Sequence, residues 1–388
     1  MLQISVTAED QSTNLQAIGF DLDDGVVVLN RTTGRLQALN GTAGAIWKAL
    51  YAGLDVSEAA DFIAETYAIG HDRARTDVDQ VVRWIAEVHR AGSPDVALVD
   101  AIPANDALEA AAIYDLGDTR VAVIGPPSEV TRHIAIVLSP HRASGSTDAI
   151  PIVISGGHDR HPFILRVADR LPLTFDLAEE AIGAVFQAIL ELRNPNIRWL
   201  AILHGASLSL HGHGIVLSAT SGSGKSTLTA ALARRGFAYH ADDMVALATP
   251  DGAIVPWPAP HSLKRGCWSV LAGAFPELSC QPIHTHAGRD LRLIAADRAA
   301  WDHPLVSSSL MVFPRYDAAA TAAINSITPM NALVRLLEDR LFLGHPVTAE
   351  AVESFLNWLV RIPAYDIVYP DTDAAERILR DLLAGLDP

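Results

Sequence analysis

The sequence predicts an α+β module of three strands and three helices, followed by an α/β domain with a phosphate-binding loop and a β-rich N-terminal subregion. Apolar residues at strand spacing and then at helical spacing fill the first part of the chain. A Gly-rich GK[ST] motif lies later, between a predicted strand and a predicted helix. The length of 388 residues exceeds that of one typical domain. We expect the boundaries 1–95, 96–198 and 199–388 for the module, the subregion and the α/β domain.

Composition excludes several classes of protein. The net charge of −16 argues against a protein that neutralises nucleic-acid phosphates and against a polybasic membrane anchor. Hydrophobic residues make up 49% of the chain, which suffices for a sizeable core. Cys267 and Cys280 cannot build a disulfide framework, and no apolar stretch is long enough to span a membrane. We therefore expect a cytoplasmic globular protein that binds neither nucleic acid nor a membrane.

The elements of the first module follow from its hydrophobic pattern. The apolar run 25–29 and the alternating segment 35–39 flank a turn at 32–34, which is typical of a hairpin. The segment Asn40-Gly41-Thr42 is suited to cap the helix that follows. Apolar residues at helical spacing predict helices over 43–52, 57–67 and 73–90.

The rest of the chain is less regular at first and then alternates between strands and helices. The β-rich subregion is predicted to hold strands at 120–124, 134–138, 152–154 and 163–165 and a helix over 177–192. The α/β domain is predicted to hold strands at 199–203, 215–217, 237–239 and 364–369, and helices over 226–235, 331–343, 349–359 and 374–386.

The segment ATSGSGKS at 219–226 matches the phosphate-binding loop GxxxxGK[ST], except that Ala219 replaces the first glycine. Backbone N–H groups of such a loop face a polyphosphate, and the dipole of the following helix adds to the attraction. Lys225 can reach the β- and γ-phosphates, and the Ser226 hydroxyl can ligate Mg²⁺. Ala219 leaves open a degenerate loop that keeps only the fold. The predicted nucleotide-binding residues are Thr220, Ser221, Gly222, Ser223, Gly224, Lys225, Ser226 and Thr227.

Two carboxylates and a histidine are the other candidate catalytic groups. Asp242 and Asp243 follow the strand after the P-loop helix, where one can hold Mg²⁺ and the other can accept a proton from a hydroxyl nucleophile. We assign Ser226 and Asp243 to the metal, and leave open which aspartate is the base. His204 closes the strand 199–203. Asp242, Asp243, Lys225 and His204 are thus the predicted catalytic residues.

The segment from His204 to Asp243 resembles the HPr serine kinase/phosphorylase family and its HPr-kinase-related relatives. The shared features are a His-Gly pair before the P-loop strand and an Ala-Asp-Asp segment after the P-loop helix. The Pro-rich segment 256–264 and the segment VFPRY at 312–316 are similar to the kinase-related branch. The resemblance implies ATP and Mg²⁺ as cofactors, with Lys264 and Arg315 contacting phosphate or substrate. The chain has no match to the RGxGxxN signature of true HPr kinases, which argues against HPr as its substrate and against the reverse phosphorylase activity.

The first module resembles PqqD-type domains, the recognition elements of ribosomally made, modified peptides. The similar segments are DGVVVLN at 24–30, TGRLQALN at 33–40 and DVDQVV at 77–82. The resemblance implies a winged-helix-like fold in which a leader peptide adds a strand between the third strand and the third helix. The leader-peptide contacts that it implies are Arg35, Leu36, Gln37, Ala38, Leu39, Val78, Val81, Val82 and Ile85.

The two resemblances together imply an ATP-dependent kinase that captures a precursor peptide by its leader and phosphorylates a Ser or Thr hydroxyl on it. Two alternatives remain open: a nucleotide-binding peptide chaperone without phosphoryl transfer, and a kinase that acts on a small molecule. The sequence does not determine the peptide, the acceptor residue, the donor nucleotide or the oligomeric state, for which a homo-oligomer is one of the alternatives.

Overall fold

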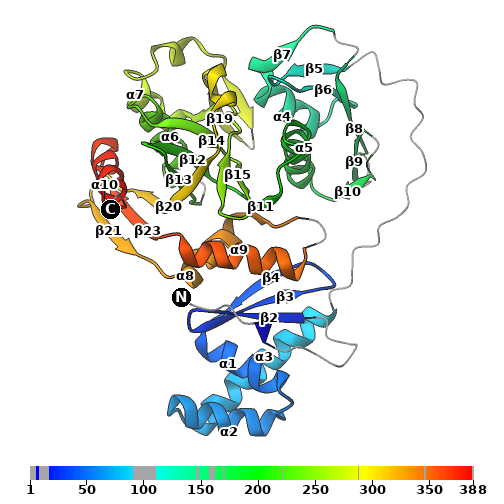
Figure 1. Cartoon of the computed structure of the whole chain (residues 1–388), viewed down its shortest axis with the longest axis vertical. Helices are drawn as coiled ribbons and strands as arrows, with labels where there is room; N and C mark the ends of the chain where they lie inside the picture. The colour runs from blue at the N-terminus through cyan, green and yellow to red at the C-terminus, as the bar shows by residue number, and fades with distance from the viewer. Residues whose placement is uncertain are drawn as a thin grey trace.

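The structure is a computed structural model. It describes residues 6–7, 17–90, 111–145, 148–156, 162–168, 170, 172–220, 222–286, 288–344 and 347–386. The expected boundary at residue 95 lies outside these ranges. Figure 1 shows the N-terminal module, in blue and cyan, on one side of the orange helices α8 (Pro329–Asp339) and α9 (Ala349–Arg361). The rest of the molecule lies on the other side of these helices. No helix within the described ranges is long and apolar enough to cross a membrane.

The N-terminal module confirms the predicted three strands and three helices and adds a two-residue strand. Its sheet has the order β1-β2-β3-β4, and all neighbours are antiparallel. The cap of the first helix lies in the predicted segment 40–42: it is Asn40, whose side chain accepts the Ala43 N–H. The elements are β1 (Val6–Thr7), β2 (Ala17–Leu22), β3 (Gly25–Asn30), β4 (Leu36–Leu39), α1 (Gly41–Tyr51), α2 (Val56–Tyr67) and α3 (His71–Arg90).

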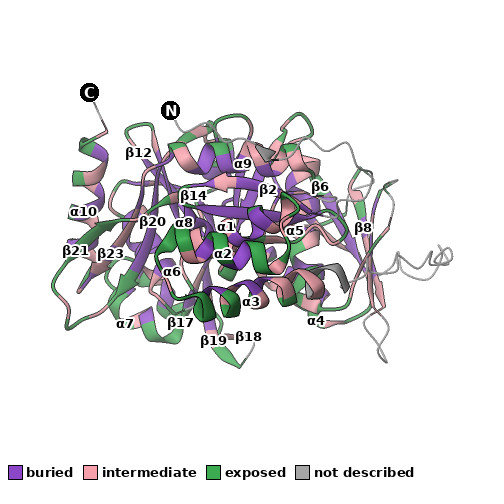
Figure 2. Ribbon diagram, turned by 90° about the horizontal axis from the view of Figure 1, so that it is seen from below, coloured by how far each residue is buried: buried purple, intermediate pink, exposed green. Residues whose placement is uncertain are grey.

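Strand β3 is buried on both faces, which explains its uninterrupted apolar run. Val26 and Val28 pack against the module's own helices, in one cluster with Trp47. The alternate residues Val27 and Leu29 belong to the large core shared with α8 and α9. A sheet covered on both faces has no solvent side on which to place polar residues. Figure 2 shows the result: the sheet is largely buried, whereas α2 exposes its outer face.

The β-rich subregion is a six-stranded sheet of order β10-β9-β8-β6-β5-β7 with two helices. One pair, β6 with β8, is parallel, and the other pairs are antiparallel. Its elements are β5 (Ala112–Asp115), β6 (Arg120–Ile124), α4 (Glu129–Val137), β7 (Arg142–Ala143), β8 (Ile150–Gly156), β9 (Phe163–Val167), β10 (Leu173–Phe175) and α5 (Ala178–Arg193).

The strand predicted at 134–138 is wrong, because these residues form the end of helix α4. Ser128 and Thr131 make a capping box, in which each side chain accepts the other residue's backbone N–H. Ile134 and Leu138 then fall on one buried face at helical spacing. The β-branched run suits a strand by propensity, but the cap and the core contacts favour the helix.

The α/β domain is built on a ten-stranded mixed sheet. Its main path has the order β14-β12-β13-β20-β16-β15-β11-β22, and β23 pairs with β20 and β21. The strands are β11 (Trp199–Leu203), β12 (Ala206–Leu210), β13 (His213–Leu217), β14 (Ala238–Asp242), β15 (Val245–Ala248), β16 (Ala253–Val255), β20 (Val306–Tyr316), β21 (Ala323–Ser326), β22 (Leu341–Phe342) and β23 (Ala364–Tyr369). Only the β13–β20 and β20–β23 pairs of this sheet are parallel.

Two helices and a small sheet complete the domain. Helix α6 (Lys225–Ala233) packs with α10 (Thr372–Ala384) over one apolar cluster that includes Leu228 and Leu379. The small antiparallel sheet has the order β17-β19-β18, formed by β17 (His261–Lys264), β18 (His284–His286) and β19 (Arg289–Ile294). The short helix α7 (Trp268–Leu271) and 3-10 turns at Arg265–Cys267, Pro276–Cys280 and Arg298–Asp302 connect the strands of this domain, and a further 3-10 turn, Ser139–His141, precedes β7 in the β-rich subregion.

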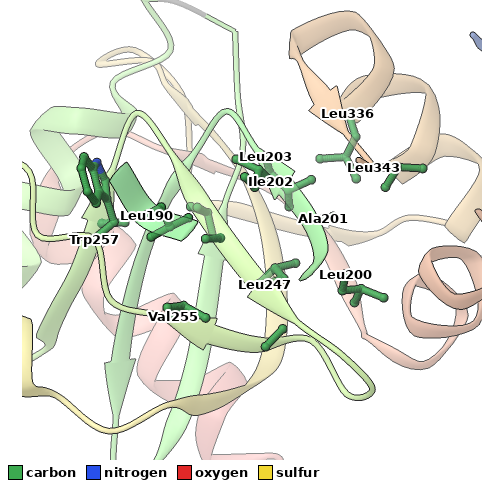
Figure 3. Close-up of a cluster of buried hydrophobic side chains, with 14 of the residues drawn as sticks. Leu190, Leu200, Ala201, Ile202, Leu203, Leu247, Val255, Trp257, Leu336 and Leu343 are labelled. Atoms are coloured by element: carbon green, nitrogen blue, oxygen red, sulfur yellow. The ribbon is translucent and has the colours of Figure 1, made fainter. Parts of the chain in front are cut away.

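Strand β11 runs through the core next to the helices that face the N-terminal module. Figure 3 shows Leu336 of α8 and Leu343 beside Ile202 and Leu203 of this strand. The helix predicted over 331–343 is therefore too long. It ends at Asp339, because Leu341 and Phe342 pair with Leu203 and Ile202 as strand β22.

Candidate active site

The predicted phosphate-binding loop at 219–226, the P-loop, connects β13 to α6 and is supported from behind by two tyrosines. Gly224 has φ of +94°, and a Cβ at this position would lie 2.8 Å from the Tyr369 hydroxyl and 3.0 Å from Tyr316 Cβ. The Tyr316 N–H also donates to the Ser223 carbonyl at 3.0 Å. Only glycine combines this backbone conformation with such a close approach. The end of β20 therefore holds the loop in shape.

The remaining loop residues are compatible with a phosphate cradle. Ala219 is not among the described residues with positive φ, so its Cβ imposes no backbone strain. The Ser223 hydroxyl is buried and has no hydrogen-bond partner among the described residues. Ser221 lies outside the described ranges. Thr220 and Gly222 are exposed, and Thr227 is half-buried in the first turn of α6.

Lys225 lies between the two aspartates that the sequence singles out. Its ammonium is 3.7 Å from Asp242 Oδ1 and 3.9 Å from Asp243 Oδ1, and its side chain is only 7% exposed. Ser226 Oγ donates to Asp242 Oδ1 at 3.3 Å. The structure thus brings the predicted P-loop lysine, the P-loop serine and both aspartates together in one site.

Asp242 is the buried member of the aspartate pair. Burial raises its pKa, and the adjacent charge of Asp243 adds to the effect, while Lys225 opposes it. Its second carboxylate oxygen, Oδ2, is buried without a hydrogen-bond partner among the described residues. An unpaired buried carboxylate oxygen is costly unless a cation or a donor satisfies it. Together with the Ser226 hydroxyl, this oxygen is the hard-ligand set that Mg²⁺ prefers.

Asp243 is the accessible member, and its backbone is in the left-handed region. Its φ is +66°, its N–H donates to Asp242 Oδ1 at 3.0 Å, and its side chain is 62% exposed. Although desolvation opposes the effect, His204 and Lys225 lower the pKa of Asp243. Non-glycine residues in this conformation cluster at functional sites, where the surroundings hold them in place. A carboxylate that stays ionised can accept a proton from an incoming hydroxyl.

His204 connects Asp243 to a third carboxylate. Its Nε2 lies 3.7 Å from Asp243 Oδ1, and its Nδ1 lies 2.8 Å from Asp339 Oδ1. Both carboxylates raise the pKa of His204. The next residue, Gly205, is required because a Cβ there would lie 2.6 Å from the Leu217 carbonyl oxygen, where the P-loop strand ends. Sequence reasoning missed Asp339, which is 135 residues from His204 and carries no motif.

Lys264 and Arg315 lie on two different strands, and only Lys264 has an observed electrostatic effect on Asp243. Lys264 ends β17, is exposed, and is one of the charges that lower the pKa of Asp243. Arg315 lies next to Tyr316, which holds the P-loop; its side chain is 65% exposed and lies 3.6 Å from Asp317. Their predicted contact with phosphate or substrate remains a prediction.

The predicted leader-peptide surface is only partly accessible. Val78 and Val81 are buried in the module core, whereas Val82 and Ile85 are half-buried on α3. Strand β4 pairs with β3 alone among the described strands. Asn30 N–H donates to the Arg35 carbonyl at 2.9 Å. Hydrogen-bonded and non-hydrogen-bonded pairs alternate along an antiparallel ladder. The backbone N–H and C=O groups of Gln37 and Leu39 therefore point to β3, and those of Leu36 and Ala38 point to the free edge of the sheet.

We expect His261, on the strand that carries Lys264, to make the protein less stable in acid. Its ring lies 4.2 Å from Tyr239 and 5.9 Å from Phe275, and burial lowers its pKa to about 4. The unfolded chain therefore binds one proton more than the native one between about pH 4 and about pH 6.5. The free energy of unfolding should fall as the pH drops through this window, by up to about 1.4 kcal/mol per pH unit from this group.

Urea unfolding of wild type and His261→Phe at pH 7.5, 6 and 5 measures this contribution. The variant should lose less stability than wild type on acidification. His211→Asn, at an exposed turn, is the matched control and should leave the pH dependence as it is in wild type. Equal pH dependence in wild type and His261→Phe would contradict the assignment.

The chain shows similarity to a solved structure and, in its N-terminal module, to a protein family. No curated protein matches the chain. The Hpr(Ser) kinase/phosphatase from Coxiella burnetii aligns with 48% of this chain and 99% of its own, at 12% sequence identity and a TM-score of 0.25. A superposition of that quality establishes no relationship. Residues 25–89 match the family described as coenzyme PQQ synthesis protein D (PqqD), so the N-terminal module contains a PqqD domain.

Proposed function

We propose that the protein is an ATP-dependent kinase that binds a ribosomally made precursor peptide through its PqqD domain and phosphorylates a Ser or Thr hydroxyl on it. One observation carries the proposal: the P-loop lysine, the P-loop serine and an ionised, accessible aspartate meet in one site. A P-loop alone supports nucleotide binding. The accessible carboxylate beside it supplies the proton acceptor that transfer to a hydroxyl requires.

Each residue of the site has a separate role in phosphoryl transfer. Backbone N–H groups of the P-loop and the Lys225 ammonium hold the phosphates of the donor and balance the charge on the transferred group. Asp243 accepts the proton of the attacking hydroxyl, and His204 keeps that carboxylate ionised and oriented. Lys264 and Arg315 attract the anionic donor or product.

Ser226 and Asp242 fit a magnesium ion better than Ser226 and Asp243. Asp242 is within hydrogen-bond distance of Ser226 and has the buried, unpartnered oxygen, whereas Asp243 is exposed and contacts His204. Mg²⁺ bound there would neutralise the charge on the β- and γ-phosphates. We therefore propose Asp242 for the metal and Asp243 for the base.

The PqqD domain supplies substrate selection. Main-chain hydrogen bonds to the open edge of β4 would give affinity for an extended leader, and the apolar surface of Val82 and Ile85 would give selectivity. Binding the leader raises the local concentration of the core peptide to roughly the millimolar range. The catalytic site can then bind the acceptor segment weakly.

The direct test is to incubate the protein with Mg²⁺, ATP and the precursor peptide encoded beside its gene, and to measure the intact mass of the peptide. A gain of one phosphate that depends on the leader supports the proposal. Unchanged mass with confirmed leader binding contradicts phosphoryl transfer and favours the chaperone. Phosphorylation of a small molecule without leader binding favours the third alternative.

Ile85→Asp tests the leader surface. We expect it to weaken leader binding at least about tenfold, because a carboxylate placed on half-buried apolar surface must be desolvated when the peptide covers it. Fluorescence anisotropy of a labelled leader measures the Kd. Gln80→Asp, on the exposed face of the same helix, adds the same charge and should bind like wild type. Equal weakening by both variants would indicate a charge effect rather than a binding surface.

A further inference from the structure

We propose that Asp339 is a positioning residue for His204, and that the N-terminal module holds Asp339 in place through helix α8. The module then contributes to turnover as well as to leader binding. The inference rests on the proposed function, since His204 matters to turnover only if Asp243 is the base. Its structural part, the connection from the module through α8 to His204, can be measured independently.

At the C-terminal end of α8, two contacts hold His204. Asp339 Oδ1 lies 2.8 Å from Nδ1 of the His204 ring, and the backbone N–H of His204 donates to the Arg340 carbonyl at 3.0 Å. With Nδ1 bound to Asp339, the ring directs Nε2 at Asp243, 3.7 Å away. A carboxylate on one ring nitrogen fixes which nitrogen carries the proton and the direction in which the other points.

Asp339 occupies a position that is unfavourable for helix stability. It is the last residue of α8, where the helix dipole disfavours negative charge, and no basic residue lies in that last turn. Its side chain is 10% exposed, and its second oxygen is buried without a hydrogen-bond partner among the described residues. The unfavourable dipole interaction and the unpaired buried oxygen both destabilise an acidic residue at this position. The hydrogen bond to the His204 ring explains why an aspartate occupies it.

The other end of α8 is held by the N-terminal module. Asp23, in the turn between β2 and β3, accepts the Met330 N–H at 2.7 Å through its side chain. Its φ is +51°, so the turn presents this carboxylate from the left-handed region. A carboxylate at a helix N-terminus satisfies a free N–H and interacts favourably with the dipole. Met330 Cε also lies close to Gly25, where an added Cβ would be only 2.7 Å away.

Between its two ends, α8 is held rigidly. Leu333 and Leu336 are fully buried against the sheet core. Arg335 forms a bidentate ion pair with Asp366, one arm at 2.7 Å, and its guanidinium lies 5.1 Å from the centre of the Phe313 ring. A helix of 11 residues is about 16 Å long, and a packed helix moves as a unit. A change at Asp23 is therefore expected to reach Asp339.

Two variants test the proposal by their effects on turnover. Asp339→Asn should lower kcat at least about tenfold, with the KM for ATP and the leader Kd unchanged, because the ring loses its orientation while both binding surfaces stay intact. Asp339→Glu, which restores the charge, should recover part of the loss. Asp23→Ala should lower kcat by about two- to fivefold and leave the leader Kd unchanged, because α8 loses the acceptor of its Met330 N–H while Thr328 still caps the helix. Asp24→Ala, the neighbouring carboxylate at the start of α1, should behave like wild type.

Two structural measurements do not depend on phosphoryl transfer. Hydrogen exchange over 329–342 should be faster in Asp23→Ala than in Asp24→Ala. The ¹⁵N shifts of the His204 ring should show a protonated Nδ1 in wild type and a changed tautomer or ring exchange in Asp339→Asn. If wild type phosphorylates no peptide, the proposed function fails. These two measurements still test whether Asp23 holds α8 in place and whether Asp339 orients the His204 ring. Unchanged exchange in Asp23→Ala, or an unchanged His204 spectrum in Asp339→Asn, would overturn the inference.

Discussion

Replacing Lys225 by alanine is expected to lower the rate of peptide phosphorylation at least about 100-fold and to leave leader binding unchanged. The ammonium is the buried positive charge at the phosphate loop, 3.7 Å and 3.9 Å from the two aspartates. Without it, the charge that develops on the transferred group is not balanced. Because the proposed leader surface lies on β4 and α3, we expect its affinity for the leader not to depend on this lysine.

Single-turnover phosphorylation and leader anisotropy on the same preparation measure the two effects. Removing Lys225 also leaves two carboxylates close together, so Lys225→Arg is a second variant that keeps the charge and the fold. Lys48→Ala, on the surface of α1, is the matched control and should phosphorylate like wild type. An undiminished rate in Lys225→Ala would contradict catalysis at the P-loop and favour another nucleotide site.

Replacing Asp243 by asparagine is expected to lower kcat by about 10²- to 10⁴-fold, the usual range for loss of a general base. Asparagine tolerates the left-handed backbone of this position, so the variant should fold and keep its affinity for ATP. The physical reason for the loss is the charge: the amide cannot accept the proton that the hydroxyl must release.

The comparison with Asp242→Asn separates the two aspartates. Asp242→Asn should need a higher magnesium concentration for half-maximal rate. The substitution removes the carboxylate whose Oδ2 is buried without a hydrogen-bond partner among the described residues and is the proposed magnesium ligand. Asp251→Asn, an exposed residue of the β15–β16 turn, serves as control and should behave like wild type. If Asp242→Asn loses turnover at saturating Mg²⁺ while Asp243→Asn changes only the magnesium dependence, the roles of base and metal ligand are the reverse of those proposed.

Local patterns were sufficient to predict most elements of the fold, and the errors have physical causes. The hairpin and three helices of the N-terminal module follow from periodicity and from a cap in the segment 40–42. The strand predicted at 134–138 failed because a capping box and core contacts outweigh β-branched propensity. The helix predicted over 331–343 was too long because Leu341 and Phe342 pair with a strand that is distant in sequence.

The sequence by itself pointed to the phosphate loop, the aspartate pair and His204 as candidate site residues, because each is a short motif next to a recognisable strand or helix. Tertiary structure alone decided how they are arranged: which aspartate is buried beside Ser226 and which is accessible beside His204. It also brought in Asp339 and Asp23, 135 and 307 positions away from the groups they contact. Such contacts form only when sheets and helices pack, and a single sequence holds no periodic signal for them.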